Sequence, residues 1–372
     1  MAGNIIRRGD NRFLVRVFLH RDPTTGRQKV HTKTIHGTKK EAQAYLNKVL
    51  RERDLGTWVE PTNMTVSEYL DRWLREADTA KQRTRTFNAW AIGKYVVPYI
   101  GSIKLSKLSG MEIKGLYYKL SGIGLASSTI RRINAILSVA FGQAVEWKLL
   151  SHNPAKGTKL AKDYGKKKQV FGPNEARRFL EQALMDRYSA LWQLALETGM
   201  RPGEYLGLKW SDIDFTNGTI LVHQSLVWHK NGQWELASPK TETSNRQIIL
   251  SSEMLESLIS HKQQQDSERK AASNDWEEYG LVFTTVRGTP IRAENLKKRH
   301  FKPILKAAGL EDMRLYDLRH STATILIAAG VPLKVVSERL GHADVSLTLR
   351  TYVHVLPSMQ AQATDTLRAA LY

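Results

Sequence analysis

The spacing of apolar residues changes along this chain of 372 residues, and the change excludes a single repeating architecture. Over residues 1–57 apolar side chains alternate with polar ones, which is typical of half-buried strands. Over residues 62–152 they recur every three or four positions, as on one face of a helix. Residues 153–169 show no apolar period, and residues 170–372 mix helical spacing with hairpin signals. Because one hydrophobic core rarely organises so long a chain, we predict three domains and a linker with these boundaries.

The first part is predicted to be a small β-sheet with one helix. Phe13, Val15 and Val17 alternate with polar residues, a second extended stretch reaches Ile35, and a helix follows over residues 38–53. Lys and Arg outnumber Asp and Glu here by 13 to 5, a net charge of +8. One helix covers one face of a sheet, so the other face is expected to be exposed and basic. Such a face suits a DNA groove, although a solvated surface explains the charge equally well.

Helices are expected over residues 62–152, because Val66, Leu70 and Trp73 lie on one face of a first helix and similar stripes follow. The next segment contains the run KGTKLAKDYGKKK, with six Lys and one Asp. It is predicted to be a basic linker over residues 153–169. It either follows a phosphate backbone or serves as a solvated tether.

The last part, residues 170–372, combines helices with tight turns. Gly199 is placed to end one helix in a left-handed cap, and Pro202 suits the first turn of the next. Two Asn-Gly dipeptides, at 217–218 and 231–232, are flanked by alternating residues and predict tight hairpin turns. We therefore expect a mixed, mainly α-helical domain with a small antiparallel sheet.

The charge and the missing cysteines narrow the class of protein. The chain has 56 Lys and Arg against 36 Asp and Glu, a net charge of +20, which concentrates polyanions and makes nucleic acid the leading partner. The sequence has no apolar run long enough for a bilayer and no apolar leader, so we expect neither membrane residence nor secretion. The absence of cysteine excludes disulfides and thiol catalysis and suits a reducing cytoplasm. We expect a cytoplasmic protein that works beside DNA, in association with the nucleoid.

Three short stretches combine Arg, His and Tyr in the way phosphoryl transfer requires. They are GMRPGE at 199–204, LYDLRH at 315–320 and LGH at 340–342, and Tyr352 follows the last by ten residues. A guanidinium is permanently charged, and its fork matches two phosphate oxygens. A lone arginine in so basic a chain would be an ordinary surface charge, but three ordered motifs argue against that. Glu204 is expected to orient the site or pair with an arginine, unless it merely begins a helix.

The motif order G-M-R-x-G-E, D-L-R-H, L-G-H and T-Y-x-H-V resembles the tyrosine recombinase family, the phage-type integrases similar to lambda integrase. The catalytic motifs cover the second half of the chain. The first two parts resemble, more loosely, the arm-type DNA-binding and the helical, SAM-like core-binding domains of that family. The resemblance implies a site-specific DNA recombinase, encoded by a bacterium or a phage. It would integrate or excise a phage or mobile element through a 3′-phosphotyrosyl intermediate.

Carried over residue by residue, the resemblance assigns four catalytic roles. Arg201 and Arg319 would be the paired arginines at the scissile phosphate, and His342 would hydrogen-bond the same phosphate. Tyr352 would be the nucleophile. Because a phenol has a pKa of about 10, Tyr352 needs positive charge or a proton acceptor nearby.

Two further assignments are less closely tied to the motifs. Lys240, at a turn of the expected sheet, would protonate the departing 5′-oxygen, with Lys230 as its competitor. Tyr316 stands three residues before Arg319, where the family usually has a histidine. A phenol is a poor base near neutrality, so we expect Tyr316 to hydrogen-bond and position, and the proton acceptor for Tyr352 stays open.

If these roles hold, the reaction needs neither a metal nor a nucleotide cofactor, because guanidinium, ammonium and imidazole groups take the cation's place. The resemblance implies a homotetramer on double-stranded DNA, with core and arm-type sites and room for a directionality factor or a host DNA-bending protein. Two alternatives share the fold, a type IB topoisomerase-like enzyme and a catalytically silent DNA-binding regulator. The separate basic N-terminal part argues against the topoisomerase, and competent residues at the diagnostic positions argue against the regulator.

Overall fold

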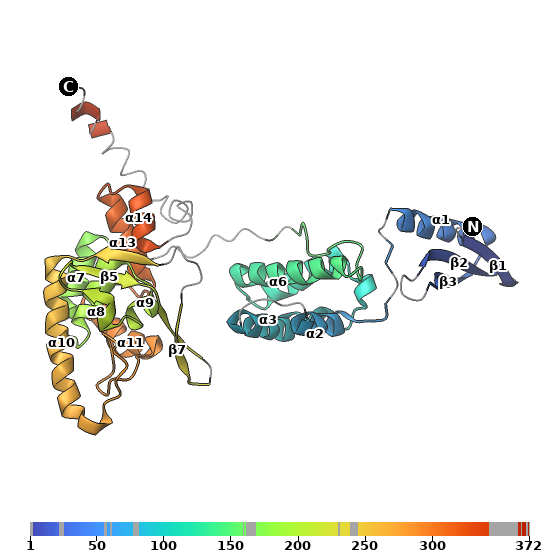
Figure 1. Ribbon diagram of the computed structural model, residues 1–372. Coiled ribbons are helices and arrows are strands. Elements are labelled where there is room, and N and C mark those ends of the chain that lie inside the picture. The colour runs from blue at the N-terminus through green and yellow to red at the C-terminus, as the bar shows by residue number, and fades with distance from the viewer. Residues whose placement is uncertain are drawn as a thin grey trace. The chain divides into compact units, whose positions relative to one another are not determined.

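The computed structural model describes residues 3–21, 26–55, 58–59, 62–76, 82–158, 160, 169–229, 231–238 and 245–341, with part of 364–371. The chain divides into two compact units, Met1–Lys166 and Lys167–Tyr372 (Figure 1). In the part of the chain so described, no helix is both long enough and apolar enough to cross a membrane.

A three-stranded antiparallel sheet opens the first unit, with β1 (Gly3–Gly9), β2 (Arg12–Arg21) and β3 (Gln28–His36) in that order. Helix α1 (Lys39–Asp54) packs on one face, and Thr38 caps it in a capping box with Glu41. The buried residues between sheet and helix are Val15, Val17, Leu19, Ala42, Leu46 and Val49. The sheet and helix expected from the sequence are present. Strand β1 was not predicted, because its paired isoleucines and paired arginines break the alternation.

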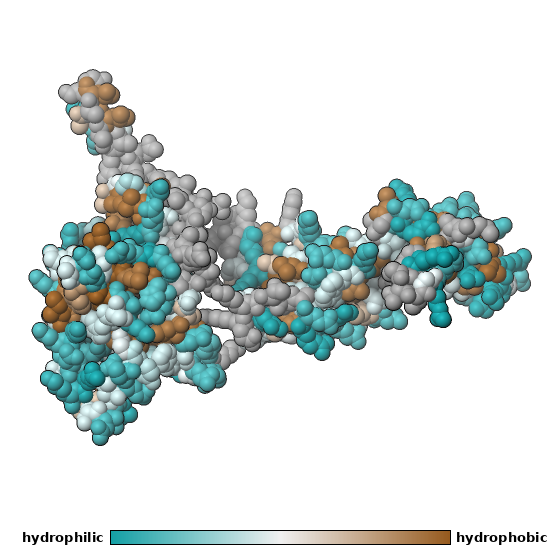
Figure 2. All heavy atoms as spheres, viewed as in Figure 1, coloured by the Kyte–Doolittle hydropathy of each residue, from teal (hydrophilic) through white to brown (hydrophobic). Residues whose placement is uncertain are grey.

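The face of this sheet that α1 leaves uncovered carries polar and basic side chains together with the half-buried Ile6 and Leu14. Arg16 lies between Asn4 on β1 and Thr32 on β3 in one row across the strands. Arg12 lies on the same face four residues earlier, and both arginines are exposed. The side of this region visible in Figure 2 is mostly hydrophilic.

The rest of the first unit is helical. It contains α2 (Val66–Glu76), α3 (Gln82–Tyr95), α4 (Val97–Ile100), α5 (Gly110–Gly122) and α6 (Ser127–Glu146). Their apolar faces share a second core, which includes Tyr69, Leu70, Trp73, Ile113, Leu116, Leu137 and Phe141. The stripe that predicted the first of these helices is therefore its buried face.

Two small sheets lie in the second unit. Strands β4 (Ile213–Asp214), β5 (Thr219–Val222) and β8 (Arg246–Ile249) form one antiparallel sheet. Strands β6 (Ser225–Trp228) and β7 (Trp234–Ala237) form a hairpin that extends from the body of the unit (Figure 1). The glycines of both Asn-Gly dipeptides have positive φ, as tight turns require.

Helices make up most of the rest of the second unit, and they leave one face of the three-stranded sheet exposed at Leu221 and Ile249. They are α7 (Pro173–Ala183), α8 (Ser189–Thr198), α9 (Pro202–Leu206), α10 (Ser252–Ala272), α11 (Ala293–Leu296), a π-helical turn (Lys297–Phe301), α12 (Lys302–Ala307), α13 (Asp317–Ala328) and α14 (Leu333–Leu340). The core beneath them includes Phe179, Trp192, Ile248, Phe283 and Phe301. This mainly helical unit with its small antiparallel sheets confirms the fold class expected from the sequence.

Candidate active site

The first arginine motif lies at a sharp turn between α8 and α9. Helix α8 ends at Gly199, whose φ of 64° is left-handed, and α9 begins with Pro202 at its first position. A Cβ at residue 199 would lie 2.6 Å from Cδ2 of Leu340 on α14, so the turn also needs glycine for space. Arg201 is thereby placed in extended backbone where α8, α9 and α14 meet.

Glu204 fastens this arginine and is itself buried. Its Oε1 accepts a hydrogen bond from Nη1 of Arg201 at 2.7 Å, and its Oε2 accepts one from the Arg201 backbone N–H at 2.9 Å. Nη2 of Arg246, on β8, donates to the same Oε2 at 2.8 Å. Burial alone would raise the pKa of Glu204, but the hydrogen bond and charge of Arg246, together with Arg201, lower it. The expected orienting role and the capping role therefore belong to one side chain.

The second arginine, Arg319 on α13, is 1% exposed. Its Nη1 donates to the Gly199 carbonyl at 2.9 Å, whereas its buried Nη2 has no hydrogen-bond partner within the described residues. Burial, followed by the charge of Arg201, lowers the pKa of Arg319 to about 10. The side chain is still protonated at neutral pH, so a buried charge carries an unused donor.

Positive charge exceeds negative charge in this cluster. Arg201, Arg246 and Arg319 surround a single ionised carboxylate, Glu204, so the four side chains sum to +2. Arg201 is 32% exposed, while Arg246 and Glu204 are 6% and 8% exposed. In the described part of the chain no group of three His, Asp or Glu side chains could hold a metal ion. The geometry therefore suits an anion that reaches the cluster from the Arg201 side.

Tyr316 lies at the start of α13, 37% exposed. Its ring meets that of His320 edge-on, with centroids 5.3 Å apart. The Tyr316 phenol is also close enough to influence the ionisation of Arg319. Between Tyr316 and Arg319, Asp317 is buried and hydrogen-bonds the backbone and side chain of Arg314, which fixes the first turn of the helix. Tyr316 therefore borders the arginine cluster.

The structure brings together Arg201, Glu204 and Arg319, with Tyr316 beside them. His342, Tyr352, Lys240 and its competitor Lys230 lie outside the described residues. The described neighbour of His342 is Gly341, whose φ of 66° ends α14 and whose carbonyl accepts a hydrogen bond from Nη2 of Arg201 at 3.3 Å. The chain thus enters residue 342 from a point in contact with the first arginine.

Arg246 is the member of the cluster that the motifs did not assign. A signal for it is nevertheless present in the sequence. Residues two apart on a strand share a face, and Ile248, two positions later, is 1% exposed. An arginine on the buried face of a strand needs a buried acidic or carbonyl partner. Periodicity therefore indicates that Arg246 has such a partner, but it does not identify Glu204.

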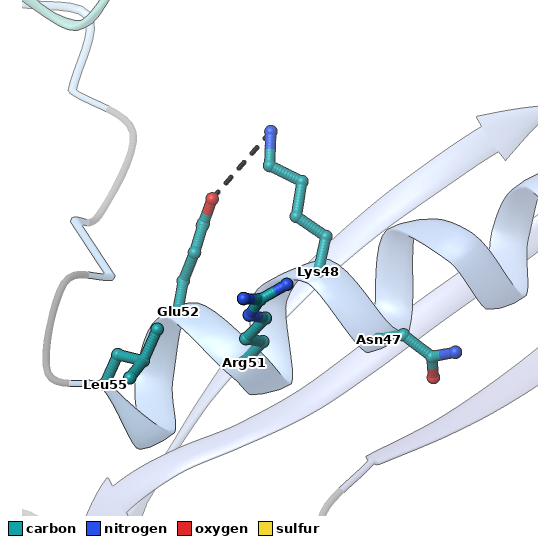
Figure 3. A pocket seen from close by; sticks show the side chains of 5 residues that line it. All are labelled: Asn47, Lys48, Arg51, Glu52 and Leu55. Carbon is teal, nitrogen blue, oxygen red and sulfur yellow. Dashed lines mark ion pairs between the residues drawn. The ribbon is translucent and has the colours of Figure 1, made fainter.

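A separate hollow lies against α1 and is lined by Asn47, Lys48, Arg51, Glu52 and Leu55 (Figure 3). Lys48 and Glu52 are one helical turn apart and form an exposed ion pair with 3.8 Å between Nζ and Oε1. Pairs of this kind are usual on solvated helix faces. The hollow belongs to the first unit, whereas both arginine motifs belong to the second, so it is not the reaction site.

Known proteins resemble this chain in sequence along nearly its whole length. The model of the phage integrase family matches residues 169–359. A tyrosine recombinase XerC-like protein of Caldanaerobacter subterraneus is 34% identical, with 98% of this chain and 97% of that protein covered. The ICEBs1 integrase of Bacillus subtilis is 28% identical, with 93% and 94% covered.

Solved structures resemble the fold. The Tn1549 transposon integrase, in a complex with circular intermediate DNA, has a TM-score of 0.70 at 20% identity and covers 82% of this chain and 99% of its own. Lambda integrase, solved as a tetramer bound to a Holliday junction, has a TM-score of 0.58 at 21% identity and covers 94% of each chain. The family model, the similarity to relatives and the paired arginines agree: this chain belongs to the phage integrase family of tyrosine recombinases.

Proposed function

We propose that this protein is a site-specific DNA recombinase that cleaves strands and rejoins them to new ends through a covalent bond to Tyr352. The observation that carries the proposal is Nη2 of Arg319, which has no hydrogen-bond partner among the described residues and lies buried beside Arg201 in a cluster of net charge +2. A buried donor without an acceptor is costly, and a phosphodiester supplies both acceptor oxygens and the missing negative charge. Double-stranded DNA is the polyanion that the family acts on.

In the proposed reaction the two arginines bind the non-bridging oxygens of the scissile phosphate. The charge on these oxygens increases at the pentacoordinate stage, so fixed guanidinium groups stabilise that stage more than the ground state. The surplus positive charge around Arg201 and Arg319 supports this assignment. Their electrostatic role does not require a metal ion at the phosphate.

The covalent step exchanges one phosphoester bond for another. The Tyr352 oxygen bonds to phosphorus, the bond from phosphorus to the 5′-oxygen breaks, and Lys240 gives that oxygen a proton. The phenolic proton of Tyr352 passes to His342 or to water, while Tyr316 hydrogen-bonds and positions the phosphate. The phosphotyrosyl ester retains the energy of the broken bond, so a 5′-hydroxyl from another strand can reverse the step.

We propose that three domains divide the DNA-binding work. Residues 1–57 would bind arm-type sites through the uncovered sheet face, where the exposed Arg12 and Arg16 follow one strand. Residues 62–152 would bind the core site opposite the catalytic domain, residues 170–372, with 153–169 as the basic linker. The similarity to relatives over nearly their full length supports assigning all three domains to one activity.

The proposed assembly is a homotetramer that holds two duplexes, because strand exchange requires two partners. The lambda integrase tetramer on a Holliday junction supports this assembly through its similar fold. We place the reaction at the bacterial nucleoid, during integration or excision of a phage or mobile element. A directionality factor or a host DNA-bending protein would select between the two directions.

A nicked suicide duplex tests the proposal. It carries the sequence of any mobile-element boundary found beside the coding region, and the nick lets the cleaved end diffuse away. The full-length protein should form a covalent adduct that survives denaturation, and Tyr352→Phe should form none. Tyr372→Phe is the matched control, because it removes a different C-terminal phenol and should leave the adduct intact.

Two results would contradict this function. Failure of the unmutated protein to form an adduct with the junction would exclude covalent recombination. Relaxation of any supercoiled plasmid by the protein, without exchange between two duplexes, would instead indicate the topoisomerase-like reaction.

A further inference from the structure

Arg246 is a buried charged side chain that has no role in the proposed mechanism. Arg246 begins β8, and its side chain is 6% exposed, too little for contact with DNA. Its guanidinium bridges two other elements. Nη2 donates to Glu204 on α9 at 2.8 Å, and Nε donates to the Arg339 carbonyl in the last turn of α14 at 2.8 Å. One fork therefore connects a strand and two helices that are distant in sequence.

The contact with α14 is reciprocal. While Arg246 donates to the Arg339 carbonyl, Nη2 of Arg339 donates to the carbonyls of Ile249 on β8 at 3.4 Å and Glu197 on α8 at 3.1 Å. A helix C-terminus carries partial negative charge, so cations are favoured there. The end of α14 is thus held against β8 by two arginines donating in opposite directions.

Gly341 is fitted against the Arg246 side chain. A Cβ at residue 341 would lie 3.0 Å from Nη1 and 3.1 Å from Cδ of Arg246, and the φ of 66° already favours glycine. The Gly341 carbonyl also accepts from Arg201. The position from which the chain enters His342 therefore depends on Arg246 directly and on Arg201.

Charge sharing gives Arg246 a second effect. Glu204 accepts from both Arg201 and Arg246, so neither arginine neutralises it alone. Without Arg246, Arg201 would be the main counter-charge to the buried carboxylate, and the net charge of the cluster would fall from +2 to +1. A cation that never contacts the phosphate would in this way keep Arg201 available to it.

We propose that Arg246 is a positioning residue for DNA cleavage, which sets both the Arg201–Glu204 pair and the end of α14 that precedes His342. The inference rests on the proposed recombinase function. Arg246 acts through its neighbours, so its removal should slow the chemical step while leaving DNA affinity unchanged. Among the described residues, Arg246 and Arg201 lower the pKa of the carboxylate that Arg246 touches, and the charge of that carboxylate in turn raises the pKa of Arg319.

The test measures single-turnover cleavage of the nicked junction duplex by full-length Arg246→Met and Arg246→Lys, with DNA affinity and melting temperature recorded in parallel. We expect Arg246→Met to cleave about 100-fold more slowly, the loss that small misplacement of reacting groups produces. Arg246→Lys should stay about 10-fold slow, because one ammonium cannot reproduce a fork directed at two acceptors. The lysine variant keeps the charge and most of the volume, so it serves as the test if Arg246→Met does not fold.

The matched control is Arg187→Met. Arg187 also donates to one glutamate and one backbone carbonyl, and these partners, Glu268 and Thr284, lie outside the motifs. Its removal should lower the melting temperature and leave cleavage by the folded protein unchanged. If Arg246→Met and Arg187→Met both lose cleavage in proportion to their fall in melting temperature, the proposal is overturned.

Two readouts separate positioning from a general structural role. In Arg246→Met the acidic limb of the cleavage rate should move to higher pH, because Glu204 loses the donor that most lowers its pKa. The effects of Glu204→Gln and Arg246→Met should also be non-additive, since both break one pair.

Parent-like cleavage by Arg246→Met or by Arg246→Lys would overturn the role of Arg246 and leave the proposed recombinase function standing. A lack of adduct with the unmutated protein would overturn the proposed function instead.

Discussion

Two arginine clusters in the second unit, one half-buried and one buried, differ in net charge. In the first, Arg187 donates to Glu268 through Nε at 2.7 Å and through Nη2, and to the Thr284 carbonyl through Nη1 at 2.7 Å. The charges cancel. Burial would lower the pKa of Arg187, but the hydrogen bond and charge of Glu268 raise it. Around Arg201 the charges do not cancel, and burial with a neighbouring cation lowers the pKa of Arg319.

The difference is between an ion pair whose charges cancel and a cluster that keeps surplus positive charge. The Arg187–Glu268 pair connects the start of α8 to α10 and uses its donors within the protein. Among the described residues the Arg319 guanidinium has one buried donor without a partner, and it lies beside two further cations. An ion pair whose charges cancel stabilises the folded chain. A cluster with surplus positive charge reduces the stability of the folded chain, and an added anion would relieve that cost. This contrast can be tested by removing one arginine from each region.

The largest effect is expected from Arg319→Met, which should slow cleavage of the nicked duplex by about 1000-fold, the upper range for losing one preorganised donor. In the absence of DNA the same change removes an uncompensated buried charge, so the melting temperature should stay equal or rise. Single-turnover cleavage and thermal unfolding measure the two effects. A fall in melting temperature with unchanged cleavage would show instead that Arg319 stabilises the fold and does not take part in cleavage.

Arg187→Met should have the opposite pattern. It leaves the half-buried Glu268 without its cation, so the free energy of unfolding should fall by about 2 kcal/mol, less than when one partner of a fully buried pair is removed. Cleavage per folded molecule should not change. Urea unfolding measures the free energy of unfolding, and adduct formation at low temperature measures the cleavage per folded molecule. Slow cleavage by this variant would show that the Arg187–Glu268 pair also affects the candidate site.

The smallest effect concerns pH. The pKa values of Glu204 and Glu268 are both lowered: burial raises each, and hydrogen bonds from Arg246 and Arg187 respectively outweigh it. Each carboxylate therefore contributes stability that is present above its unfolded pKa of 4.5 and is lost as pH falls through the lower folded value. Glu204→Gln and Glu268→Gln should each flatten the acid fall of the unfolding free energy, measured by urea titration below pH 5. Parallel acid limbs in parent and variants would contradict the assigned cause.

Local rules predicted much of the fold. Alternation along β2 and β3, the apolar stripes of α2 and α6, and the left-handed cap at Gly199 act over a few residues, so the sequence displays them directly. The sequence pattern did not predict strand β1, because Ile5 and Ile6 are adjacent and break the alternation of apolar and polar residues. The strand joins the sheet through backbone hydrogen bonds to β2, which its own sequence does not indicate.

In the candidate site, too, some features follow from the sequence and others only from the tertiary structure. The sequence by itself determined which side chains carry permanent charge, that Arg201 stands between two helices, and that Arg319 and Gly341 follow in a fixed order. Only the tertiary structure decided which cations share Glu204, since Arg246 is 42 residues from it and the Gly341 carbonyl is 140 residues from Arg201. Backbone propensities act within a turn of helix or a pair of strands, whereas the surplus charge arises from packing α9, α13, α14 and β8 together. Long-range packing thus brought three basic residues together into a cluster with surplus positive charge.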